Sequence, residues 1–505
     1  MKIFKILLPI ILCLGMASCQ KFIDIKKSSS QSIVTTANDC QLLLDDYAKM
    51  NTNYPLDCEV SADDYFVNSV SAQLSNIAQE EKDLYNWNPT AQRLSSSPNW
   101  IVPYNIINNA NLVLQTLDKL KGGSDDPALL NALRGAALFY RAYCFWTVAQ
   151  MYAKPYMAST ANQDPGIPLR FDPDINIKST RGTVQETYTQ ILADLQEAVS
   201  LLPRTSDYTT RPNKIAAYAM LARTYLSMAD YPNALINANA ALEIKKDLID
   251  FNTLNTTSAT PFNPRFNKEV IFYSISRYSA GVPFIGTILV PGSTTDNSCV
   301  ARINPDLVDS YAVNDLRRSI FLKSNTINVS LDIPPTPTNP NPGKAPVSLS
   351  DGTFRFSGNY EPVTFPTFFT GLAVDEILLI RAECYARAGN IGAAATDLNL
   401  LLSMRWKTGT YTNMSSTTAP DVALNTILSE RRKELLMRGL RWTDLRRLNK
   451  PALRITKDVS FTGTTTSPVK VENITTSTLP ANDLRFTLLI PKEVIDNSSL
   501  AQNAR

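Results

Sequence analysis

Small apolar residues recur at helical spacing in the segment 214–243, KIAAYAMLARTYLSMADYPNALINANAALE, and predict two antiparallel helices joined by a tight turn. Ala222, Tyr225 and Ala229 fall at i, i+3 and i+7, on one face of a helix. Pro232 stands where a second helix can begin. Because alanines on facing surfaces let two backbones approach closely, we expect the chain to be organised around helical pairs of this kind.

The same spacing recurs in other parts of the chain. Residues 380–395, IRAECYARAGNIGAAA, repeat it with Tyr385 in the place of Tyr225 and Gly389 in the place of Ala229, and a fainter copy surrounds Phe145. The pattern is typical of tetratricopeptide (TPR) helical hairpins. The copies lie ~80 and ~160 residues apart, too far for one continuous array with a ~34-residue period. We therefore expect helical pairs separated by long insertions; an ordinary alanine-rich bundle is the alternative.

Hydrophobic periodicity predicts further helices and few strands, so the predicted fold class is mainly α with a TPR-like scaffold. The periodic segments are 39–50, 100–120, 127–151, 183–202, 373–388 and 422–448. Asn38 or Asp39 is the expected cap of the first, and Gly439 is expected to break the last. The best strand candidate is 269–274, EVIFYS. The Pro-rich stretch 325–350 is expected to be a stiff exposed excursion, and 454–505 an irregular tail.

The N-terminus has the three parts of a secretion signal. Lys2 and Lys5 supply the positive end, and the apolar run 6–14 is too short to span a bilayer. The signal ends MASC at Cys19, which resembles a bacterial lipoprotein signal in which this thiol is acylated. A plain secretory signal is the alternative. The expected organisation is a signal peptide at 1–18 and one domain at 19–505, with halves at about 19–260 and 261–505.

Composition removes several classes of function. The 505 residues carry a formal charge of only +3, which gives no electrostatic footprint for nucleic acid. Histidine is absent, so nucleophiles activated by histidine and histidine-based metal sites are excluded, and we expect no cofactor and no metal. Of the cysteines, Cys144 and Cys384 are expected to be small core residues, while pairing of Cys40 with Cys58 stays open.

Six segments together resemble the SusD/RagB-like nutrient-binding outer-membrane lipoproteins. They follow one another in the order expected for that family and cover most of the chain. They are CQKFIDIKK after the signal, Trp100-x3-Tyr104-x2-Ile107-x2-Ala110-Asn111, LRGAALFYRAYCFWTVAQMYAKPY, YTQILADLQEAVSLLP, ILSERRKELLMRGLRWTDLRRL and IPKEVIDNS. The chain departs from the family at Ala153-Lys154-Pro155, where members usually have a glycine-containing turn.

The resemblance implies a SusD-like fold of four TPR-like helix pairs decorated by loops. It also implies a protein that is not an enzyme and that is lipid-anchored in the cell outer membrane, facing the cell exterior. Such a protein captures a glycan or oligosaccharide and passes it to a SusC-like TonB-dependent transporter. The alternatives are a peptide or other nutrient as ligand, a TPR scaffold that binds a protein partner, and a carboxylate-dependent glycosidase.

Aromatic loops are the expected ligand sites, because sugars stack on aromatic rings and their hydroxyls need polar partners. The residues selected on this basis are Asp64, Tyr65, Tyr85, Trp87, Asn88, Arg93 and Tyr278. Trp100 is expected to pack in the core. The charged run 430–447 contains Glu430 and Glu434 among many arginines, which would keep these carboxylates ionised and unsuited to acid catalysis. We expect a structural ion-pair network there.

Overall fold

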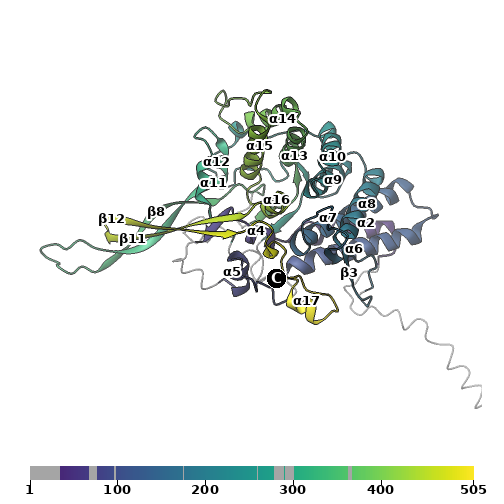
Figure 1. Cartoon of the computed structure of the whole chain (residues 1–505), viewed down its shortest axis with the longest axis horizontal. Helices are drawn as coiled ribbons and strands as arrows, with labels where there is room; N and C mark the ends of the chain where they lie inside the picture. The colour runs from purple at the N-terminus through teal and green to yellow at the C-terminus, as the bar shows by residue number, and fades with distance from the viewer. Residues whose placement is uncertain are drawn as a thin grey trace, which may run out of the picture.

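A computed structural model describes residues 34–67, 77–95, 98–174, 176–258, 260–277, 289, 301–361 and 367–505. In Figure 1 the helices form the body of the molecule and long strands project from one side of it. The expected lipidation site Cys19 and the candidate Tyr278 lie outside the described residues.

Long helices build the body by packing in nearly sequential order. Helix α6 packs on α7, α7 on α8, α8 on α9, α9 on α10, and α10 on α13, which also contacts α14 and α15. These helices are α6 (Pro98–Leu120), α7 (Pro127–Tyr152), α8 (Val184–Leu201), α9 (Lys214–Ser227), α10 (Tyr231–Ile244), α13 (Val374–Arg387), α14 (Ile391–Ser403) and α15 (Pro420–Glu434). The mainly α, TPR-like scaffold is therefore confirmed.

Shorter helices join or flank these. They are α2 (Ala37–Leu44), α3 (Tyr47–Met50), α4 (Asp57–Val60), α5 (Gln79–Tyr85), α11 (Pro305–Ser310), α12 (Leu316–Phe321), α16 (Arg441–Arg447) and α17 (Lys492–Asp496), with the 3-10 turns η2 (Phe251–Thr253) and η3 (Leu484–Phe486). Gly439 has a φ of +73° between α15 and α16, so the predicted break is confirmed. Within the described part of the chain, no helix is long and apolar enough to cross a membrane.

The two hairpins that share the alanine pattern have the same turn. Helix α9 is followed by Ala229 at φ +58° and α13 by Gly389 at φ +76°. Each next helix is then capped by a short polar side chain: Asp230 accepts from the Asn233 amide, and Asn390 accepts from the Ala393 amide. Both hairpins were predicted from the sequence, and the facing alanines are buried as that prediction requires.

The cap predicted for the first helix was wrong by a few residues. Helix α2 starts at Ala37, so Thr36 is its N-cap and accepts from the Asp39 amide at 3.1 Å. Asp39 lies in the first turn, and its carboxylate accepts from the Thr36 amide at 2.9 Å. This reciprocal pair is a capping box, which needs an acid three residues after the cap.

Strands form one four-stranded sheet and several two-stranded pairs. The large sheet has the order β12-β11-β7-β8. Its strands are β7 (Leu322–Asp332), β8 (Lys344–Phe356), β11 (Ala452–Thr464) and β12 (Ser467–Leu479). The short antiparallel pairs are β1 (Tyr65–Val67) with β6 (Ala301–Ile303), β2 (Pro165–Pro168) with β3 (Arg181–Thr183), β4 (Val270–Phe272) with β10 (Leu372–Ala373), and β5 (Ile275–Arg277) with β9 (Thr367–Phe369). The predicted strand at 269–274 corresponds to β4.

Two segments expected to be irregular are long β-hairpins that project from the body (Figure 1). The first is β7–β8 in the Pro-rich stretch, where most prolines lie in the turn between the strands. Pro346 lies inside β8, which is an edge strand of the described sheet and therefore tolerates a missing amide donor. The second is β11–β12, rich in threonine and valine, which favour strands. The exposed character of the first segment was predicted correctly; its regular pairing was not.

Cysteines in the described residues are all free thiols. Cys40, Cys58, Cys144 and Cys384 are buried and none is in a disulfide. Burial raises the pKa of the Cys40 thiol to about 11 and that of Cys384 to about 12. The core role expected for Cys144 and Cys384 agrees with this placement, and Cys40 does not pair with Cys58.

Candidate binding site

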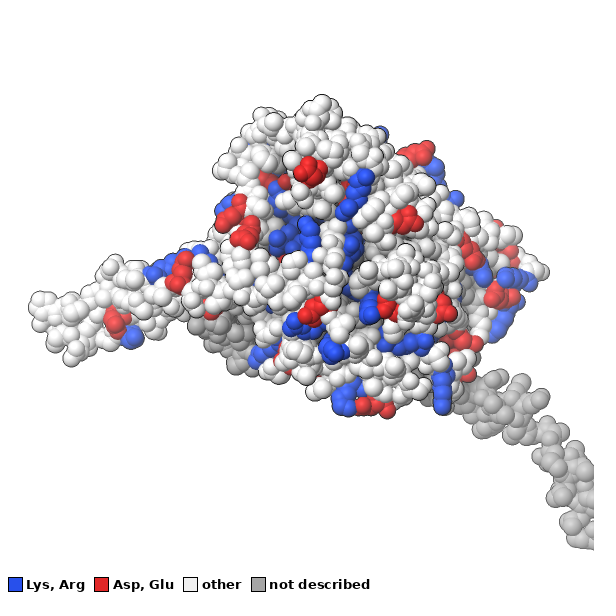
Figure 2. All heavy atoms as spheres, in the orientation of Figure 1, with Lys and Arg blue, Asp and Glu red and all other residues white. Residues whose placement is uncertain are grey.

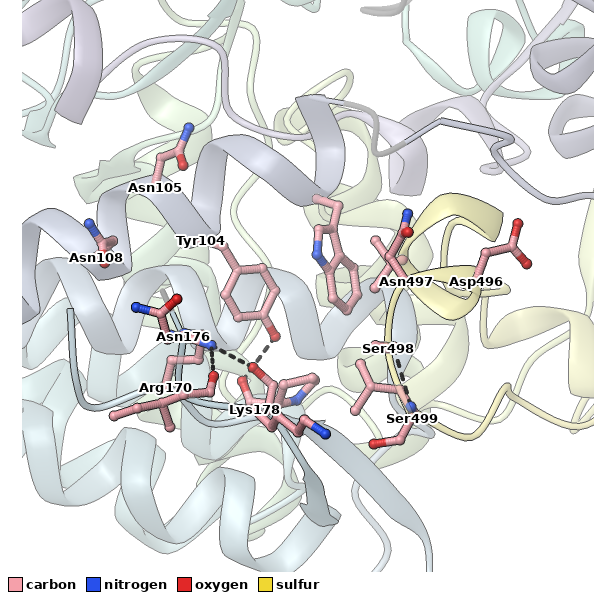
Figure 3. A pocket seen from close by; sticks show the side chains of 16 residues that line it. Tyr104, Asn105, Asn108, Arg170, Asn176, Lys178, Asp496, Asn497, Ser498 and Ser499 are labelled. Carbon is pink, nitrogen blue, oxygen red and sulfur yellow. Dashed lines mark hydrogen bonds between the residues drawn. The ribbon is translucent and has the colours of Figure 1, made fainter. Parts of the chain in front are cut away.

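A cleft of about 780 Å³ opens where three distant segments meet (Figure 3). The first part of α6, the loop between β2 and β3, and the C-terminal segment around α17 form its walls. Its lining residues are Trp100, Tyr104, Asn105, Asn108, Pro168, Arg170, Asn176, Ile177, Lys178, Ser179, Val494, Asp496, Asn497, Ser498, Ser499 and Leu500.

Two aromatic rings from one face of α6 form the apolar part of the cleft. Trp100 and Tyr104 are one helical turn apart, and their ring centroids lie 4.9 Å from each other. The Tyr152 ring also packs edge-on against Trp100, with ring centroids 5.2 Å apart, and Trp100 is only 9% exposed. The expectation that Trp100 packs in the core is confirmed, yet the residue also lines the cleft.

Tyr104 is fixed by a bond to the opposite wall. Its hydroxyl donates to the Pro168 carbonyl at 2.9 Å. Burial raises the pKa of Tyr104, so the phenol stays neutral and keeps this donor role. The bond ties α6 to the loop after β2, which sets the width of the cleft.

Arg170 organises the loop between β2 and β3. Its guanidinium donates to the carbonyls of Asp174 at 2.7 Å and Ile177 at 2.9 Å, and to the Ser179 hydroxyl at 2.7 Å. The Asn111 side chain of α6 donates to the Arg170 carbonyl at 2.9 Å. The loop is therefore cross-linked internally and to α6, and it presents Asn176 and Lys178 to the cleft.

Several polar side chains of the cleft have no bond within the described part of the protein. Asn105 and Asn108 project from α6, and Lys178 projects from the loop (Figure 3). No hydrogen bond or ion pair to another described residue uses their side-chain nitrogens or oxygens. Amide groups that no internal partner occupies are available to hydroxyl groups of a ligand. The cleft therefore combines fixed rings with free donors and acceptors.

The described lining residues of the cleft do not include a facing pair of carboxyl groups. Asp496 is the only carboxylate among its described lining residues, and it is paired with Lys492 at 2.7 Å. Hydrolysis of a glycosidic bond needs two facing carboxyl groups in most glycosidases. The geometry suits binding by stacking and hydrogen bonding.

Three aromatic residues selected from the sequence come together away from this cleft. Tyr65, Tyr85 and Trp87 surround the guanidinium of Arg454, whose central carbon lies 5.6, 3.8 and 4.3 Å from their ring centroids. The Trp87 indole donates to the Ser61 carbonyl at 2.8 Å, and the ring is 5% exposed. Tyr65 is fully buried, and Tyr85 is half-buried. The cluster is a cation–π stack that anchors β11 to the N-terminal segment.

The charged members of the same selection are paired internally. Asp64 is buried and accepts from Arg432 at 2.6 Å, and Arg93 is buried and pairs with Asp57. Asn88 is half-buried and its side-chain oxygen accepts from Thr90. These contacts show where the residues lie; ligand binding by them stays a prediction, as it does for Tyr278 outside the described residues.

The ion-pair network expected in 430–447 is present. Arg317 contacts Glu430 at 2.5 Å and Glu434 at 3.1 Å, and Arg405 contacts Glu434 at 2.8 Å. Figure 2 shows basic side chains gathered near the centre of one face, where Figure 1 places α16. Glu430 and Glu434 are therefore both held in ion pairs with arginine side chains.

Most of the cleft was not identified from the sequence. Trp100, Tyr104 and IPKEVIDNS were noted only as family-like motifs, and the loop between β2 and β3 was not among the selected segments. The available signal was two aromatic residues and two asparagines at helical spacing on one face of α6. Tertiary packing brings the other two walls of the cleft to that face of α6.

Comparisons with known proteins agree with this architecture. Residues 21–226 match the family described as "Starch-binding associating with outer membrane", and residues 375–504 match the SusD family. SusD-like protein P2 of Formosa agariphila is 24% identical over 384 residues, which cover 69% of this chain and 71% of that protein.

Solved structures show the same fold. A SusD superfamily protein from Bacteroides thetaiotaomicron has a TM-score of 0.67 at 21% identity, covering 93% of this chain and 100% of the other. A SusD-like carbohydrate binding protein from Bacteroides vulgatus has a TM-score of 0.63 at 19% identity, covering 92% and 98%. The chain belongs to the SusD/RagB family, because two SusD-type family models match it over residues 21–226 and 375–504.

Proposed function

We propose that this protein captures an oligosaccharide in the cleft at α6 and passes it to a SusC-like TonB-dependent transporter. The observation that carries the proposal is the pairing of the fixed Trp100–Tyr104 platform with the free amides of Asn105 and Asn108. Sugar rings offer flat C–H faces to aromatic side chains, while their hydroxyls need donors and acceptors beside the ring. The family description and the carbohydrate-binding relative of the same fold support a glycan over other nutrients.

The N-terminal sequence supports an outer-membrane location for this activity. A signal that ends at Cys19 would leave a lipid anchor on the outer membrane, and the protein would face the cell exterior. Replacing Cys19 with Ser should move the protein from the detergent-extracted fraction to the aqueous fraction. In detergent extracts of cells, the wild-type protein should copurify with a β-barrel transporter, and its absence would count against the delivery step.

Binding without turnover is the expected behaviour. Glycan binding should be measured by calorimetry on a panel of oligosaccharides and peptides, with the products analysed after long incubation. Release of shortened glycan would contradict the proposal. Binding of peptides but of no oligosaccharide would show that the ligand is a peptide.

The double variant Asn105→Ala/Asn108→Ala tests the cleft directly. These amides have no partner in the described residues, so their loss should leave the fold intact. Removing two ligand hydrogen bonds should weaken glycan binding by about tenfold or more. The control is Tyr208→Ala, which removes a ring that is 59% exposed outside the cleft and should not change affinity. Equal affinities for both variants would exclude the cleft as the glycan site.

A further inference from the structure

A second cavity, of about 230 Å³, lies between the loop after α7, the end of α16 and the η3 segment. It shares no lining residue with the cleft at α6. Its walls are largely apolar: Leu445 and Phe486 are buried beneath it, and Met157 and Leu484 are 52% and 43% exposed. A ligand that enters here would cover apolar surface that is otherwise in water.

The acidic side chains of this cavity are already neutralised. Asp164 pairs with Lys154 at 2.6 Å, and Asp483 pairs with Arg485 at 2.6 Å. Neither carboxylate therefore offers a free negative charge to a ligand.

Two cationic side chains of the cavity have no such partner. Arg446 is 6% exposed and donates to the carbonyls of Gln150 and Ala153, while its Nε atom has no acceptor. Lys450 is exposed at the rim, and none of the described carboxylates pairs with it. Burial lowers the pKa of Arg446, which reflects a charge held away from water without a counter-ion. The cavity therefore has an excess of positive charge.

Two asparagines at the rim add neutral donors. Asn449 and Asn482 have φ values of +50° and +60°, in the left-handed region that asparagine tolerates better than most residues. No side-chain bond to another described residue occupies their amides. The rim thus offers Lys450 and two free amides above an apolar floor.

We propose that this cavity binds a small organic carboxylate with an apolar body, at a site separate from the glycan cleft. The carboxylate would lie beside Lys450 and the asparagine amides, where charge-assisted hydrogen bonds are strongest. The apolar body would lie on Phe486 and Leu484. The charge of the ligand follows from the uncompensated cations, and its apolar part follows from the walls.

Saturation-transfer NMR with benzoate and its neutral analogue benzamide tests this on the mature full-length protein. Benzoate should receive saturation and titrate in the millimolar range or below, and benzamide should bind at least about tenfold more weakly. Lys450→Glu should reduce benzoate affinity by a similar factor, and the matched surface control Lys119→Glu should not. Asn482→Gly keeps the left-handed turn but removes an amide, so it should weaken binding without unfolding the protein.

Three results would overturn the inference. One is equal binding of benzoate and benzamide, which would remove the anion preference. Another is unchanged benzoate affinity in Lys450→Glu. The third is the absence of saturation transfer to benzoate up to about 10 mM. Each is read independently of glycan binding at α6, because the two cavities have no lining residue in common.

Discussion

Arg405 shows how this fold keeps many charges in its interior. It is fully buried, contacts Glu269 at 2.9 Å and Glu434 at 2.8 Å, and donates to the Ile249 carbonyl at 2.8 Å. Phe251 lies against the guanidinium at 4.2 Å. Such a site fixes several segments at once, because Ile249 and Phe251 come from one part of the chain, Glu269 from a second and Glu434 from a third.

Replacing Arg405 with Met should therefore be strongly destabilising. It leaves Glu269 buried without a cation and leaves Glu434 with Arg317 alone, and breaking a buried pair in this way costs about 3–5 kcal/mol. Urea denaturation followed by circular dichroism measures the change. Lys492→Met is the control, since its pair with Asp496 is exposed and should contribute little. A loss as small as that of the control would show that the pair does not stabilise the fold.

Glu59 makes the stability of the protein depend on pH. The side chain is 1% exposed, one oxygen accepts from the Gly439 amide, and the other has no partner in the described residues. Burial, helped by Asp64, raises the pKa of Glu59 to about 8. The folded state then binds a proton that the unfolded state releases above its ordinary pKa of 4.5, so this group lowers stability as pH rises from 4.5 to about 8.

Glu59→Gln should remove this contribution, since glutamine stays neutral and can still accept from Gly439. The variant should gain stability relative to the wild type as pH rises, by at most about 1.4 kcal/mol per pH unit. Urea midpoints at about pH 6 and about pH 8 give the two values to compare. If the urea midpoints of the wild type and the variant change by the same amount between the two pH values, Glu59 is ionised at both.

At the scale of elements, the two related hairpins offer a matched test of their turns. Ala229 and Gly389 occupy equivalent left-handed positions, with φ of +58° and +76°. An L-residue with a side chain pays roughly 1 kcal/mol there relative to glycine. Ala229→Gly should therefore stabilise the protein, and Gly389→Ala should destabilise it by a similar amount, since an added Cβ at Gly389 meets no atom within 4 Å.

Thermal melting of the two variants measures these opposite shifts. Shifts of the same sign would show that the two turns do not share one conformation. Shifts of opposite sign would support one hairpin geometry that follows from the shared sequence pattern.

The helices were predictable because apolar residues recur every three to four positions within a single element. The hairpin 214–243 and the helix at Pro127–Tyr152 needed no information from distant residues. The strands of the large sheet, β7, β8, β11 and β12, were not predicted. They pair with one another and carry many exposed polar residues, so their sequences show only weak alternation of apolar and polar positions. Proline in the turn of the first hairpin made that stretch look irregular as a whole.

At the scale of the whole molecule, the cleft exists only after three distant segments meet. Trp100 and Tyr104 were visible as a motif, but the loop carrying Arg170 and Lys178 joins them through tertiary bonds such as Tyr104 to Pro168. Three of the aromatic loop residues selected from the sequence, Tyr65, Tyr85 and Trp87, contact Arg454, and ligand binding by them stays a prediction. Composition identifies which side chains can bind a sugar, and only packing decides which of them remain free.

The central claim is that the glycan lies in the cleft at α6. Hydrogen–deuterium exchange on the mature protein, with and without the glycan that the binding panel identifies, tests it most directly. We predict protection confined to residues 98–108, 168–179 and 494–500, which carry the three walls of the cleft. Protection of residues 77–95 around Tyr85 and Trp87, with no change at the cleft, would contradict this account and would place the ligand at the aromatic loop.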